Sequence, residues 1–184
     1  MNPAVSNLVI SLGAMQVARK IPFDDPQILT YVRIGYVVSQ VVVLGVYYYV
    51  AMKIKQKNDL TVLKYVEPQP MSKEAGNLVT TTVRDYDLAE TSKLVRGVYT
   101  GLAMMAFLHL YLKYTQPLFI QALMAFKTLY DAKPVAIHLF GQAAEGDLKR
   151  PFKSAGLFGA TANPQTDKAA IDEAEKRVGS KKDE

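Results

Sequence analysis

Apolar residues are gathered into four blocks along the chain, with polar stretches between and after them. The blocks cover residues 5–18, 28–52, 94–112 and 118–129. The second block holds 25 residues with Arg33 as its only charge. As a helix rising about 1.5 Å per residue, it is longer than the roughly 30 Å hydrocarbon core of a bilayer. The pattern therefore predicts an all-α membrane protein with three to four transmembrane or membrane-embedded helices.

The two shorter blocks leave the number of crossings open. Block 5–18 is short for a span and carries Asn7 and Ser11 on one helical face, so a spanning helix and a half-buried interfacial helix are both open. Block 118–129 follows Pro117 and is too short to cross a full-thickness bilayer comfortably.

The polar stretches define the predicted domains. Residues 53–93 form a loop of mixed charge, and the chain from residue 131 onward is polar and rich in Gly, Pro and Lys. We therefore predict a membrane domain at 1–130, with 53–93 as its cytosolic loop. Residues 131–184 are predicted to be a cytosolic, flexible, basic tail that is partly disordered.

The sidedness follows from the basic residues. With four crossings and a cytosolic N-terminus, the loop 53–93 holds seven Lys or Arg and the tail nine, against three in the lumenal turns. This bias fits the positive-inside rule, and it disappears with three crossings. Lys181 and Lys182 precede the last two residues. They look like the cytosolic dilysine retrieval signal of endoplasmic-reticulum membrane proteins, which again favours an even number of crossings.

A charge inside the second block needs an explanation. An arginine at mid-membrane costs roughly 2.5 to 3.5 kcal/mol on insertion scales. Arg33 lies near the end of its block, so snorkelling toward the headgroups is one explanation. The other is a polar intramembrane groove, because polar residues share faces on three of the blocks. The candidate groove residues are Asn7, Ser11, Arg33, Tyr36, Gln40, Arg96 and Thr100.

Composition removes several classes of function. The chain has no cysteine and two histidines, and it contains no H-x-x-x-H, Gly-rich phosphate loop or G-x-S-x-G motif. We therefore predict no catalytic residues, no metal and no cofactor, and a protein that is not an enzyme. The net charge of +5 favours an acidic partner, such as anionic lipid or RNA.

A short basic strip is the second candidate site. Lys149, Arg150 and Lys153 lie within five residues, and Pro151 keeps them off one regular helix. An extended basic strip binds phosphate without reading sequence. Contact with ribosomal RNA and a position near anionic lipid are both open.

Five motifs, in order along the chain, resemble one family. They are LKYVEP (63–68), TTVRDYDL (81–88), YTGLAMM (99–105), HLYLKYTQPLF (109–119) and IHLFG…GDLKRPFK (137–153). The family is the fungal SRP-independent targeting protein three family, also described as the inorganic phosphate transport protein of the Pho class. The resemblance covers the chain from Met1 to about Gly159.

This resemblance implies a multi-pass endoplasmic-reticulum membrane protein of the SRP-independent (SND) targeting pathway. The implied partners are the Sec translocon, the ribosome, client membrane proteins, other SND components and the lipid bilayer. The expected function is targeting and insertion of membrane proteins, as an insertase with a polar intramembrane groove. The alternative is a non-catalytic scaffold or chaperone subunit of a translocon, with an indirect role in phosphate transport through transporter maturation.

Overall fold

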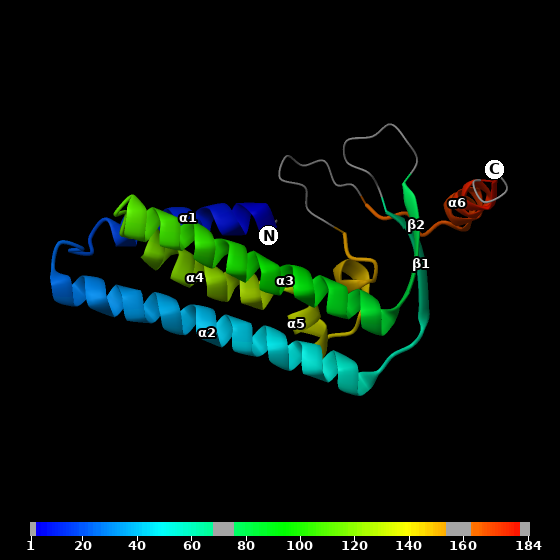
Figure 1. Cartoon of the computed structure of the whole chain (residues 1–184), viewed down its shortest axis with the longest axis horizontal. Coiled ribbons are helices and arrows are strands. Elements are labelled where there is room, and N and C mark those ends of the chain that lie inside the picture. The colour runs from blue at the N-terminus through cyan, green and yellow to red at the C-terminus, as the bar shows by residue number, and fades with distance from the viewer. Residues whose placement is uncertain (1–2, 68–75, 154–162, 181–184) are drawn as a thin grey trace. The chain divides into compact units, whose positions relative to one another are not determined.

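The computed structural model describes residues 3–67, 76–153 and 163–180, and it is predominantly helical, as expected (Figure 1). The elements are α1 (Pro3–Ala18), α2 (Pro26–Lys57), β1 (Val62–Glu67), β2 (Asn77–Thr82), α3 (Val83–Ala106), the π-helical turn η1 (Phe107–Tyr111), α4 (Gln116–Asp131), α5 (Lys133–His138), the 3₁₀ turn η2 (Gly146–Leu148) and α6 (Lys168–Ser180).

Contacts divide the chain into two compact units. Unit 1 comprises Met1–Ala51 and Thr91–Ala136, and unit 2 comprises Met52–Glu90 and Ile137–Glu184. This grouping rests on packing, whereas the predicted boundary at residue 130 separates membrane from cytosol. The predicted division therefore stays a prediction.

The longest helix, α2, has clear start and stop signals. Pro26 occupies its first position, where a missing N–H costs nothing. The Asp25 carboxylate accepts the backbone N–H of Gln27 at 2.8 Å. At the other end, Lys55 and Lys57 lie in the last turn, and Asn58 follows in the left-handed region with φ at 46°. Both features are common helix endings.

In the part of the chain that the structure describes, two helices are long and apolar enough to cross a bilayer: Pro26–Lys57, and Val83–Tyr111, which joins α3 to η1. Their length and composition are compatible with a membrane protein. The apolar part of the second helix begins after Glu90. Helices α1 and α4 have 16 residues each, about 24 Å, which is shorter than a roughly 30 Å hydrocarbon core. A third and a fourth crossing therefore stay predictions.

Unit 1 has a small core and a largely apolar outer surface. Helix α1 packs against α4, and α2, α3 and α4 meet around Tyr36, Met105 and Leu118. Many large apolar side chains point outward, and among them are Leu8, Val9, Val37, Val41, Met104, Leu110 and Leu123. An apolar surface of this extent marks contact with another apolar phase or surface.

Unit 2 contains a β-hairpin that the all-α prediction missed. Strands β1 and β2 pair antiparallel, from Val62 opposite Thr82 to Glu67 opposite Asn77. Both segments are rich in β-branched residues, which favour strands. The hairpin packs with α6, and its Tyr65 joins Tyr86, Ile137 and Phe152 in a core cluster. The loop 53–93 and part of the predicted tail thus form packed structure.

Candidate functional site

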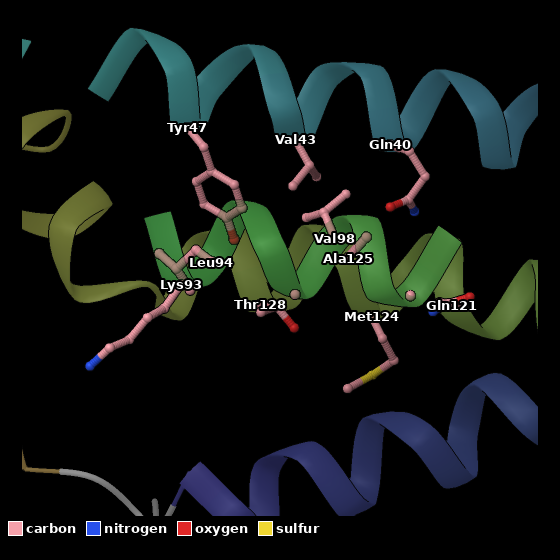
Figure 2. A pocket seen from close by; sticks show the side chains of 12 residues that line it. Gln40, Val43, Tyr47, Lys93, Leu94, Val98, Gln121, Met124, Ala125 and Thr128 are labelled. Atoms are coloured by element: carbon pink, nitrogen blue, oxygen red, sulfur yellow. The ribbon is translucent and has the colours of Figure 1, made fainter. Parts of the chain in front are cut away.

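A cavity of about 370 Å³ lies among α2, α3 and α4 of unit 1 (Figure 2). Its lining mixes apolar side chains with five polar ones: Gln40, Tyr47, Lys93, Gln121 and Thr128. This volume lies in the range of ligand-binding pockets, which are mainly apolar with a few placed polar groups. The cavity is therefore the candidate functional site of unit 1.

Helix α2 supplies one wall of the cavity. Gln40, Val43 and Tyr47 follow one another at spacings of three and four residues, so they share one helical face. Figure 2 shows all three side chains projecting from α2 toward α3 and α4. Gln40 is 6% exposed, and its Nε2 donates to the Ser39 hydroxyl at 3.2 Å. An amide is thus held at a buried position among apolar helices.

The opposite wall depends on small residues of α3. Gly97 and Gly101 both line the cavity. A Cβ at Gly101 would lie 3.1 Å from Nε2 of Gln121 on α4, whereas one at Gly97 would meet nothing within 4 Å. Gly101 therefore gives the Gln121 side chain room to approach. The buried Gln121 Oε1 has no hydrogen-bond partner among the described residues, and such an unpaired acceptor is costly.

The structure brings only some of the predicted groove residues to this cavity. Gln40 lines it, and the Ser11 hydroxyl lies 3.5 Å from the sulfur of Met124, a lining residue. Tyr36 packs instead in the core cluster, where its buried hydroxyl has no partner among the described residues. The remaining candidates are exposed and do not line the cavity: Asn7, Arg33, Arg96 and Thr100. The groove role itself stays a prediction.

Sequence reasoning missed four of the five polar lining residues. Lys93 was assigned to the end of the loop 53–93, and Tyr47, Gln121 and Thr128 lie in blocks that were interpreted only as apolar. The stripe through Gln40 continues to Tyr47 at the next helical repeat, so Tyr47 could have been found. Gln121 and Thr128 lie seven residues apart on α4, which is the same signal of a shared face.

Arg33 has a partner that the sequence did not suggest. Its Nε donates to Nε2 of His109 in η1 at 2.9 Å. His109 is buried, and its Nδ1 lies 3.0 Å from the backbone oxygen of Tyr114. The charge of Arg33 is therefore positioned by a histidine 76 residues further along the chain.

A buried ionic cluster holds unit 2 together. The Asp87 carboxylate is fully buried and accepts two hydrogen bonds of 2.6 Å from Arg150. His138 Nε2 lies 2.6 Å from the same carboxylate. Burial raises the pKa of Asp87, but the hydrogen bonds from His138 and Arg150, with their charges, outweigh it and hold the pKa below its usual value.

This cluster changes the picture of the basic strip. The Arg150 side chain is 12% exposed and bound to Asp87, so it is not a free phosphate-binding group beside its neighbours. Phe152 is buried, and its backbone N–H donates to the Tyr86 hydroxyl at 2.6 Å. Lys149 and Lys153 remain exposed. Lys181 and Lys182 lie outside the described residues. Within the described ranges, no group of three or more metal-ligating side chains could hold an ion.

These features define a class: a helical protein with two helices of membrane-spanning length and a polar-lined cavity between apolar helices. The chain belongs to the family described as Phosphate transport (Pho88), whose model matches residues 1–182.

Curated relatives agree over nearly the whole length. SRP-independent targeting protein 3 of Saccharomyces cerevisiae is 50% identical over 179 residues, covering 96% of this chain and 95% of that protein. The SRP-independent targeting protein 3 homolog of Schizosaccharomyces pombe is 42% identical, covering 95% of this chain and 91% of its own length. An uncharacterised protein of the same yeast is 46% identical, covering 89% of this chain and 83% of its own length. No solved structure matches the chain significantly.

Proposed function

We propose that this protein acts in the SRP-independent targeting of membrane proteins and helps to insert them into the bilayer. Two relatives that match almost end to end carry the name of that process. The cavity of unit 1 is the observation that supports an insertase in particular, because it places polar side chains among apolar helices.

The cavity would act on the polar groups of an entering segment. An unpaired polar group costs several kcal/mol in hydrocarbon. Gln40, Gln121 and Thr128 offer amide and hydroxyl partners to such groups during their passage. Helices α1 and α4 are short, and short segments thin the bilayer around them. Both effects lower the barrier that a polar flank meets.

The proposal places the protein in the endoplasmic-reticulum membrane as a multi-pass protein. The loop 53–93 and the C-terminal tail would face the cytosol, as the basic residues suggest. The proposed partners are the Sec translocon, the ribosome, other SND components, client membrane proteins and the lipid bilayer, and no enzymatic step is involved. Protease added to sealed microsomes should remove an epitope placed after Glu184, and protection of that epitope would contradict this topology.

The cavity is tested by changing its amides to an apolar residue of similar size. Gln40→Leu and Gln121→Leu should leave protein levels unchanged, because neither breaks an ion pair. Both should reduce insertion of an SRP-independent client into the membrane. Gln116→Leu is the matched control, since Gln116 is exposed on α4 and does not line the cavity. Normal client insertion by both cavity variants would contradict the insertase proposal.

The alternative is a scaffold that docks the ribosome, and the exposed Lys149 and Lys153 of unit 2 favour it. Changing both to Ala should then weaken co-sedimentation with ribosomes at moderate salt, since phosphate contacts are salt-sensitive. Changing the exposed Lys55 and Lys57 to Ala removes the same charge elsewhere and serves as the control. Equal loss in both pairs would mean that only total charge matters and would remove the specific docking role.

A further inference from the structure

Arg33 of unit 1 carries a charge that its own helices do not neutralise. Residues 26–57 and 91–130 contain no Asp or Glu at all. The acidic side chains of unit 1 are Asp24, which is exposed, Asp25, whose carboxylate caps α2, and Asp131, which is paired with Lys127. Among the described residues, none of the three forms an ion pair with Arg33. Apolar side chains surround Arg33 in sequence, and Ile34 is 55% exposed. A counter-ion for this guanidinium must therefore come from outside these helices.

Among the described residues, a single side chain, that of His109, forms a hydrogen bond with Arg33. Because the Arg33 Nε donates to Nε2 of His109, that nitrogen carries no proton. The ring proton is then on Nδ1, which donates to the Tyr114 oxygen at 3.0 Å. His109 is thus a neutral acceptor whose tautomer and orientation are set by the backbone.

The backbone around His109 is shaped for this contact. Residues Phe107–Tyr111 form a π-helical turn, and the Tyr114 N–H bonds to the Leu108 oxygen at 3.0 Å. Lys113 lies between this turn and Tyr114, and its φ of 61° is a left-handed conformation that is most common for glycine. This turn brings the Tyr114 carbonyl back to the histidine ring. Irregular helical turns and left-handed residues of this kind are frequent at functional sites.

A guanidinium has five N–H donors, and this one uses a single donor within the part of the chain that the structure describes. The remaining donors form the planar fork that matches the oxygens of a phosphate or carboxylate. Arg33 lies seven residues after Pro26, about 10 Å along the helix, so it can reach toward a headgroup. Exposed tyrosines flank the pair in sequence, at Tyr31, Tyr111 and Tyr114. Tyrosines concentrate at the membrane interface.

We propose that Arg33, positioned by His109, binds the phosphodiester of a membrane phospholipid. The ligand chemistry is an oxyanion with at least two acceptor oxygens. A phospholipid headgroup, toward which Arg33 can reach from α2, supplies such an oxyanion. This role is separate from the cavity, which Arg33 does not line, so either proposal can fail alone.

The test is the binding of phosphatidylglycerol to the purified full-length protein in detergent, measured stepwise by native mass spectrometry. Arg33→Gln should raise the Kd of the tightest binding step roughly tenfold, because hydrogen bonds from a charged donor contribute about that much to affinity. Arg96→Gln is the matched control, because Arg96 is also exposed and lies in an apolar block but has no histidine partner among the described residues. It should change binding less than about twofold.

The positioning role of His109 has its own variants. His109→Leu should lose nearly as much binding as Arg33→Gln, since the guanidinium is no longer held. His109→Gln keeps one acceptor and one donor and should restore most of the binding. Equal melting temperatures of the two His109 variants, with different lipid binding, would support positioning over a merely structural role. Equal lipid binding by these two variants would contradict it.

Three results would overturn the lipid assignment. Equal weakening by Arg33→Gln and Arg96→Gln would reduce the effect to total charge. Displacement of the tightest lipid by excess sodium phosphate would assign the site to a dissolved anion. Unchanged lipid binding by Arg33→Gln, with lost crosslinking to a client's acidic flank, would assign the arginine to a protein carboxylate.

Discussion

Replacing Arg150 by Met should destabilise unit 2 strongly. The sequence alone predicts the opposite, because it places Arg150 in a solvent-exposed basic strip. The change keeps most of the side-chain volume and removes the charge. It leaves the Asp87 carboxylate, which is 0% exposed, without the two 2.6 Å hydrogen bonds that it accepts from Arg150. Removing one partner of a buried ion pair typically costs about 3 to 5 kcal/mol. We expect the lower end, because His138 stays at 2.6 Å from the carboxylate.

The measurement is urea denaturation of the full-length protein in detergent, followed by brief proteolysis and mapping of the cleaved bonds. Cleavage within unit 2 should occur at lower urea in Arg150→Met than in the wild type. Lys64→Met is the matched control, since it breaks the Lys64–Glu175 pair, whose side chains are 45% and 44% exposed. An exposed pair of this kind contributes about 0 to 1 kcal/mol.

A double variant separates the ion pair from simple packing. Asp87→Leu with Arg150→Met removes both charges, so no unpaired carboxylate stays buried. Such replacements are often neutral or stabilising, and the double variant should be more stable than Arg150→Met alone. A loss below about 1 kcal/mol for Arg150→Met, equal to the control, would refute the reasoning that this arginine is a structural partner of Asp87.

Three further outcomes follow from the same contacts. The folded-state pKa of Asp87 is lowered, so the ionised carboxylate stabilises the fold above about pH 3.9, and this stabilisation is lost as the pH falls through the folded-state pKa. Asp87→Asn should therefore reduce the dependence of stability on pH in this acid range, as denaturation at several pH values would show. Gly97→Ala should be neutral or stabilising by up to about 1 kcal/mol in thermal melts, because the added Cβ meets no atom within 4 Å. Gly101→Ala should stabilise less or destabilise, because its Cβ would lie 3.1 Å from the Gln121 Nε2. Tyr86→Phe removes the hydroxyl that accepts the buried backbone N–H of Phe152 and should cost about 1 to 3 kcal/mol in urea denaturation.

The sequence predicted the elements that depend on local pattern. The long helix α2 follows from an uninterrupted apolar block with proline before it and lysines after it. The hairpin was missed because each strand has only six residues and lies in a region of mixed charge. Its stability comes from packing with Tyr86 and Phe152, which no short window contains.

The candidate sites were harder to predict because their contacts are long-range. The stripe that contains Gln40 could be read from helical spacing, and this residue does line the cavity. The Arg33–His109 and Asp87–Arg150 contacts join residues 76 and 63 positions apart. Periodicity says which residues share a face of one helix, but not which helix that face meets.

The two arginines show how surroundings decide the role of a charge. Arg150 is met by a buried carboxylate of the same chain, so its charge is satisfied internally and serves stability. Arg33 is met by a neutral histidine, which accepts one hydrogen bond but supplies no negative charge. Since α2 and residues 91–130 contain no acidic residue, no carboxylate of these segments compensates this charge. A charge that the fold positions but does not neutralise is suited to bind an external anion. In apolar surroundings the attraction between the two charges is stronger than in water.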